Sequence, residues 1–133
     1  MLEQGLVMQL QGDPAVAAIS PVGGFFGVLP KGTALPSWAY STITDSEEYT
    51  LRGKAGLSSC TIQIDCFAST PEDCIQLART IDAVLSGYRG KLPDPDATGI
   101  DSCFRTNKSD FFDDATRTYR RMLEYQIWLY ESA

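Results

Sequence analysis

Histidine is absent from this chain of 133 residues. Histidine is the usual general base of serine and cysteine hydrolases and the commonest neutral metal ligand, so its absence removes the ordinary routes to both kinds of site. The phosphate-loop pattern G-x-x-x-x-G-K-[ST] and the nucleophile elbow G-x-S-x-G are also missing. Glycine pairs such as Gly23-Gly24 therefore indicate turns, and the sequence gives enzymatic function no positive support.

Long apolar runs are missing too. No segment reaches the roughly 18 uninterrupted apolar residues of a membrane span. The opening Met1-Leu2-Glu3-Gln4 lacks the basic and apolar regions of a signal peptide. We therefore expect neither secretion nor a membrane partner, and without secretion the glycosylation pattern at Asn107-Lys108-Ser109 is expected to have no meaning.

Positive charge is scarce, since 11 Lys and Arg stand against 17 Asp and Glu, giving a net charge of −6. Binding to phosphates requires clustered basic residues. The densest basic cluster and the acids close to it in sequence are Arg117, Arg120 and Arg121, and Asp110, Asp113 and Asp114. Specific nucleic-acid binding is therefore disfavoured, whereas passive passage of DNA along an acidic surface is compatible with this composition.

The length fits one domain, residues 1–133. A chain of this size can bury about two-thirds of its unfolded surface and so can fold without disulfides or metals. The apolar share of 44% and the charged share of 21% are ordinary for a globular protein.

Two short helices are predicted at the N-terminus. Leu2, Leu6 and Leu10 recur at helical spacing, which indicates a helix over residues 2–10 that ends at Gln11-Gly12. Asp13-Pro14 then supplies an N-cap followed by proline at the first helical position, and "AVAAI" continues the second helix.

The clearest helix covers residues 71–86. Thr70 is a suitable N-cap, Pro71 suits the first position, and two acids follow in the first turn, where they complement the helix dipole. Gly87 is well placed as the C-terminal stop. One apolar stripe runs along the helix through Cys74, Leu77, Ala78, Ile81 and Leu85.

Strands are predicted over residues 37–44, 57–68, 100–112 and 117–131, with a short extended piece at 25–29. In 57–68 the even positions Cys60, Ile62, Ile64 and Cys66 form one apolar face. The polar, glycine-ended residues 45–56 are expected to form a protruding, mobile loop, and residues 90–99, "GKLPDPDATG", a linker.

The last strand has apolar residues on both faces. Tyr119, Leu123, Tyr125, Ile127 and Leu129 share one phase, and Met122, Trp128 and Tyr130 share the other. The second set has two interpretations: a subunit contact, or packing beneath the N-terminal helices of the same chain.

This order of elements predicts an α+β fold of two layers. An antiparallel sheet is covered on one face by the main helix, residues 71–86, and a short N-terminal helical pair accompanies it.

Three of the four cysteines fall in residues 60–74, "CTIQIDCFASTPEDC", together with the acids Asp65, Glu72 and Asp73. The spacings C-x5-C and C-x7-C do not match zinc sites. Because Cys60, Cys66 and Cys74 share the phase of apolar neighbours, the favoured interpretation is a core that uses sulfur. A metal or redox site and a Cys66–Cys74 disulfide remain as alternatives.

The acids also have two interpretations. Asp65, Glu72 and Asp73 could form a carboxylate site, but the favoured interpretation places Asp65 on the polar strand face and the other two at the helix start. The cluster Asp110, Asp113 and Asp114 does not match a calcium loop, so a solvated acidic loop is preferred over a cation site. We assign no catalytic, cofactor-binding or metal-binding residue and expect no cofactor.

Several segments, in order, resemble small tail-completion proteins of siphophages and prophages, which are similar to tail terminators. The chain opens with "MLEQGLVMQLQGDPAVAAIS" and continues through "GVLPKGTALPSWAYSTI". The most specific part is "GLSSCTIQIDCFASTPEDCIQLARTIDAVLSGYRG", and "YRRMLEYQIWLYE" resembles the family's last strand. Together these segments cover almost the whole chain. No catalytic motif belongs to the family, so the resemblance implies no active-site residue.

The resemblance implies a structural virion protein, made in the host cytoplasm and located at the head-proximal end of the tail. It implies a homo-oligomeric ring, usually a hexamer, that caps the tail tube and offers a docking surface to the head–tail connector. Its partners would be the major tail tube protein and the connector, with DNA passing through the lumen. The alternatives are a head-side connector or neck component, and a thiol or metal enzyme using Cys60, Cys66 and Cys74.

Overall fold

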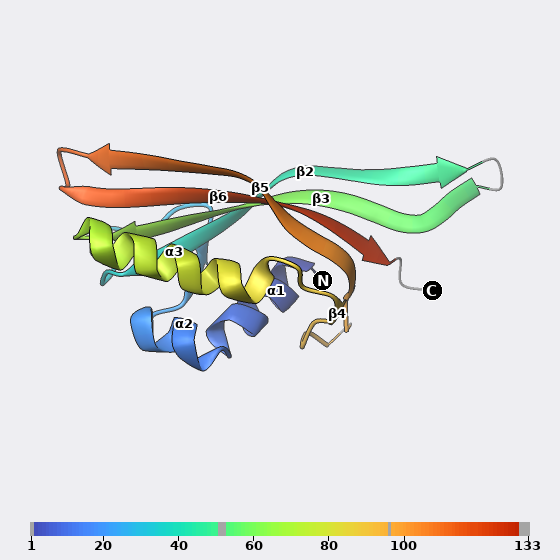
Figure 1. The fold of residues 1–133 in the computed structure, drawn as a ribbon, viewed down its shortest axis with the longest axis horizontal. Helices are drawn as coiled ribbons and strands as arrows, with labels where there is room; N and C mark the ends of the chain where they lie inside the picture. Colours follow the sequence, from blue (N-terminus) through green and yellow to red (C-terminus); the bar gives the residue numbers. More distant parts are fainter. Residues whose placement is uncertain (1, 51–52, 96, 131–133) are drawn as a thin grey trace.

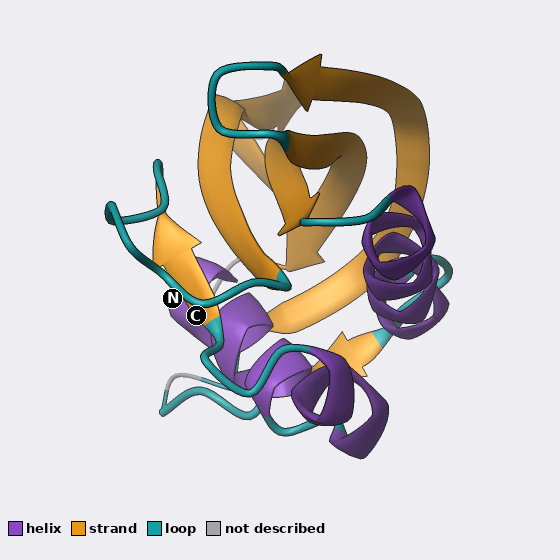
Figure 2. Ribbon diagram, turned by 90° about the vertical axis from the view of Figure 1, so that its left-hand side faces the viewer, coloured by secondary structure: helices purple, strands orange, loops and turns teal. Residues whose placement is uncertain are grey.

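The computed structural model describes residues 2–50, 53–95 and 97–130. Its six strands form one sheet in the order β1-β2-β3-β6-β5-β4. Their bounds are Gly24–Phe26 for β1, Ser37–Thr50 for β2, Gly53–Ala68 for β3, Gly90–Lys91 for β4, Gly99–Asp113 for β5 and Thr118–Tyr130 for β6. The sheet curls strongly (Figure 2).

The three helices confirm the predictions closely. They are α1 (Leu2–Gln11), α2 (Pro14–Ile19) and α3 (Pro71–Leu85). The Asp13 carboxylate caps α2 by accepting hydrogen bonds from the N–H groups of Ala15 and Val16. The Thr70 hydroxyl caps α3 by accepting from the N–H of Asp73. Gly87, just past α3, has a φ of 80°, which glycine adopts without strain.

All three helices lie on one side of the sheet (Figure 1). The even residues of β3 and the odd residues of β6 face them, because Ile62 pairs with Tyr125 and Ile64 with Leu123. The apolar stripe of α3 closes over this face, and its members Cys74, Leu77, Ala78, Ile81 and Leu85 are all buried. The predicted two-layer α+β fold is therefore confirmed.

The predicted antiparallel sheet needs one correction, because β1 runs parallel to β2. β1 begins at Gly24 and ends at Phe26, whereas the sequence predicted an extended piece over 25–29. Gly24 pairs with Trp38, and a Cβ at Gly24 would overlap the Trp38 ring. The close approach of this ring to the β1 backbone requires glycine.

The prediction of a loop over residues 45–56 is wrong. β2 continues to Thr50 and β3 begins at Gly53, so all but residues 51 and 52 of this segment belong to strands; those two lie outside the described residues. The backbone of β3 is held by β6 as far as the pair Leu57–Tyr130. Ladder hydrogen bonds need no apolar pattern, and a polar sequence therefore continues a long hairpin.

The predicted linker over 90–99 is also more ordered than expected, with residue 96 outside the description. β4 pairs with the start of β5, and Leu92 is buried. Asp94 accepts hydrogen bonds from the Thr98 N–H at 2.9 Å and the Thr98 hydroxyl at 2.7 Å. The strands predicted over 100–112 and 117–131 are confirmed as β5 and β6, except that residue 131 is not described.

Candidate assembly surfaces

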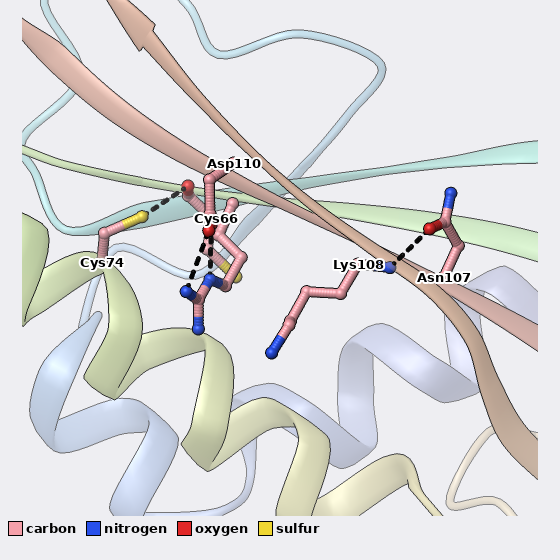
Figure 3. Close-up of polar contacts among 6 residues, drawn as sticks. Cys66, Cys74, Asn107, Lys108 and Asp110 are labelled. Atoms are coloured by element: carbon pink, nitrogen blue, oxygen red, sulfur yellow. Dashed lines mark hydrogen bonds and ion pairs between the residues drawn. The ribbon is translucent and has the colours of Figure 1, made fainter.

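The cysteines belong to the core, as the favoured interpretation predicted. Cys60, Cys66, Cys74 and Cys103 are all buried and none forms a disulfide. The Cys74 Sγ donates a hydrogen bond to the carbonyl oxygen of Cys66 at 3.3 Å, which joins α3 to β3 (Figure 3). Within the described ranges no group of three or more metal-ligating side chains gathers.

Burial makes these thiols poor nucleophiles. It raises the pKa of Cys66 well above its usual range, and the neighbouring Cys74 and Asp65 raise it further. Burial likewise raises the pKa of Cys74 and takes the pKa of Cys103 to about 12. Because the thiolate is the reactive form, all three side chains are held in their inert state near neutral pH.

We expect the folded protein to show almost no fast-reacting thiol near neutral pH and all four after unfolding. Titration with an aromatic disulfide reagent, with and without denaturant, measures this. Since folded pKa values are raised, the unfolded chain binds fewer protons above about pH 9, and stability falls as pH rises from there. Rapid reaction of a thiol in the folded protein would contradict the core assignment.

Asp65 lies on the sheet face away from the helices, as predicted, yet it is 7% exposed. Its carboxylate accepts hydrogen bonds from Arg120 Nε at 2.9 Å and from Gln63 Nε2 at 2.9 Å. Glu72 and Asp73 stand apart from it in the exposed first turn of α3. Asp65 therefore belongs to an ion pair on the sheet, whereas Glu72 and Asp73 belong to the start of α3, and the three acids do not form one carboxylate site.

The basic cluster near the C-terminus is neutralised within the chain. Besides the pair of Arg120 and Asp65, Arg121 Nε lies 2.6 Å from Asp110 Oδ1 (Figure 3) and Arg117 Nη1 lies 3.8 Å from Asp114 Oδ1. A hydrogen bond from Arg121 lowers the pKa of Asp110. Asp113 accepts from the N–H groups of the turn at residues 115 and 116. Asp110, Asp113 and Asp114, which were predicted to be simply solvated, therefore each have a partner within the chain.

The position of Trp128 excludes one of the two interpretations of the second apolar face of the last strand. It pairs with Ser59 in β3, whereas its neighbour Ile127 pairs with Cys60 in the core. Strand alternation therefore places Trp128, together with Met122, on the face opposite the helices. Packing beneath the N-terminal helices is excluded for these two residues, and the side chain of Tyr130 lies outside the described part.

Exposed aromatic and aliphatic residues were missed by sequence reasoning. Phe26 is 68% and Val28 75% exposed, and Ile43, Phe104, Phe111 and Phe112 are exposed as well. The loop at residues 27–35 and the end of the β5–β6 hairpin border a groove of about 710 Å³ above Gln63 and Asp65. The adjacent pair Phe111-Phe112 was the available signal, because consecutive strand residues face opposite sides and cannot both enter one core.

Both edges of the sheet are largely open. β1 covers β2 only at residues 38–40, and β4 covers β5 only at residues 99–100. The Gly87 N–H also donates to the Cys103 carbonyl at 2.7 Å. In the part of the chain that the structure describes, residues 41–50 of β2 and 104–113 of β5 pair with no further strand. Figure 1 shows these segments in hairpins that extend to opposite ends of the molecule.

Comparison with known proteins gives the family. The family model described as Tail completion protein gp17 matches residues 4–130. The chain belongs to this family. Its members are structural components that complete the phage tail, so this is a virion protein of the tail and not an enzyme. The alternative of a thiol or metal enzyme is therefore wrong.

A solved structure has a similar fold. A chain of "Virion of native gene transfer agent (GTA) particle" superposes with a TM-score of 0.73 at 13% sequence identity, covering 97% of this chain and 94% of that chain. No individually curated protein matches this member of the gp17 family in sequence. None of its described helices is long and apolar enough to span a membrane.

Proposed function

We propose that this tail-completion protein forms a ring, expected to contain six copies, at the head-proximal end of the tail tube. There it caps the tube and contributes to the head–tail joint. Its partners are further copies of itself, the major tail tube protein and the head–tail connector. The observation that carries the proposal is the pair of open sheet edges on a member of the tail-completion family.

Two different open edges suit a closed ring. A copy whose one edge fits the other edge of the next copy assembles head to tail, and such assembly closes when the rotation between copies divides a full turn. Open strands are also a liability on a free monomer, because their unpaired N–H and C=O groups recruit other strands. Assembly into a ring would cover both.

The charge distribution suits passage of DNA without binding. The chain has a net charge of −6, and its three clustered arginines are each paired with a carboxylate of the same chain. A surface that neutralises no phosphates gains nothing from release of counterions, so DNA would slide past it.

Electron microscopy of the protein mixed with purified tail tubes tests the proposal. We expect a ring on one end of each tube, whereas the free protein can be monomeric in light scattering because assembly can need the tube. Bare tube ends at saturating protein would reject the tube-capping function. Capture by portal-side proteins together with bare tubes would instead establish the alternative, a head-side connector or neck component.

A further inference from the structure

The two open edges carry exposed apolar side chains. Beside the β2 edge, Ile43 is 46% exposed, and a groove between α1 and the β1–β2 pair is lined in part by Met8, Phe26 and Glu3. Along the β5 edge Phe104 is 47% exposed, with Phe111 and Phe112 further along. Apolar groups along an unpaired edge favour cover by another strand.

Strand directions within a ring favour pairing of the β2 edge of one copy with the β5 edge of the next. β2 is antiparallel to β3, β3 to β6, and β6 to β5, so β2 and β5 run in opposite directions. Rotation about a ring axis preserves the direction of each strand along that axis, and β5 of one copy would meet β2 of the next antiparallel. The open segments lie at opposite ends of the molecule, which requires a stagger between copies. A closed sheet needs such a stagger because its strands tilt against the axis.

We propose that residues 104–113 of β5 pair antiparallel with residues 41–50 of β2 of a second copy. This inference rests on the proposed ring and names the surface that builds it. The ring would then enclose one continuous sheet, to which each copy contributes its strands.

Cross-linking between single-cysteine variants tests which edges meet. Ile43→Cys marks β2 and Phe111→Cys marks β5, because antiparallel pairing of the two segments places residue 43 opposite residue 111. Both positions are exposed, while the native cysteines are buried. On tail tubes, a short bis-maleimide should link a mixture of the two variants into covalent dimers. Neither variant alone should be linked, nor a mixture of Ile43→Cys with the control Ala83→Cys, which lies on the exposed side of α3.

Three results would overturn the pairing. Cross-linking of Phe111→Cys to itself indicates a β5–β5 contact, and cross-linking of Ile43→Cys to itself indicates a β2–β2 contact. Rings that form on tubes without any 43–111 link place the interface elsewhere while leaving the proposed function intact. Microscopy of the same samples separates these cases from failure of ring formation, which rejects both proposals together.

Discussion

Replacing Trp38 with alanine is expected to lower the free energy of unfolding by about 3–5 kcal/mol. The Trp38 side chain is 1% exposed, and its ring lies against the backbone of Gly24 and 6.1 Å from the ring centre of Tyr40. It fills the core where β1 joins the sheet, and Gly24 has no Cβ that could move in to close the gap. The cavity therefore persists, and the loss approaches the upper values for such substitutions.

Urea unfolding followed by circular dichroism measures the loss. Trp38→Phe separates packing from hydrogen bonding, because Trp38 Nε1–H finds no acceptor within the described structure. Phenylalanine removes this unsatisfied donor and most of the volume stays, so we expect a loss of only about 1 kcal/mol. Val28→Ala, at a side chain that is 75% exposed, should change stability by less than about 0.5 kcal/mol. A loss below 1 kcal/mol for Trp38→Ala would contradict this account of the core.

The elements that were predicted well have their caps and their apolar pattern within their own residues. Thr70, Pro71 and Gly87 mark the ends of α3, and the stripe through Leu77 and Ile81 gives its buried face without reference to the rest of the chain. β3 is equally legible, because Ile62 and Ile64 alternate with polar residues. The burial of the cysteines followed from the same phases.

The features that the sequence could not show depend on strand pairing between residues that are far apart in the chain. Residues 45–50 form strand because β3 lies beside them, and β3 is held there by β6. The parallel pairing of β1 needs the contact of Gly24 with Trp38, which no local pattern encodes. The open edges are likewise a property of strand order, since an edge exists only once the neighbours of each strand are known.

The candidate assembly surfaces were likewise only partly predictable from the sequence. Sequence phase placed Trp128 opposite the core residues of β6, but it could not decide between a subunit contact and packing under the helices. The register with Ser59 excludes packing under the helices, and the subunit contact stays a prediction. Exposure of Phe111 depends on the register of β5 with β6, which pairs it with Arg120 on the sheet face that the helices do not cover.

The second large loss of stability is expected from breaking the ion pair between Arg120 and the buried carboxylate of Asp65. Arg120→Met keeps most of the side-chain stem, and it leaves the Asp65 carboxylate, 7% exposed, with Gln63 as its remaining side-chain partner among the described residues. Breaking a fully buried ion pair costs about 3–5 kcal/mol. The Arg120 side chain is 36% exposed and so is partly screened by water, and we expect a loss of about 2–3 kcal/mol.

A double-mutant cycle isolates the contact. Asp65→Asn removes the charge at nearly constant size, and in that background Arg120→Met should cost about 1–2 kcal/mol less than in the wild type, since no buried carboxylate is left unpaired. Arg117→Met is the matched control, because the pair of Arg117 and Asp114 spans 3.8 Å and both side chains are exposed, at 79% and 91%. Its effect should stay below about 0.5 kcal/mol. Equal losses at positions 120 and 117 would mean that the Asp65 carboxylate is solvated, and the sheet face opposite the helices would then be open to water at this point.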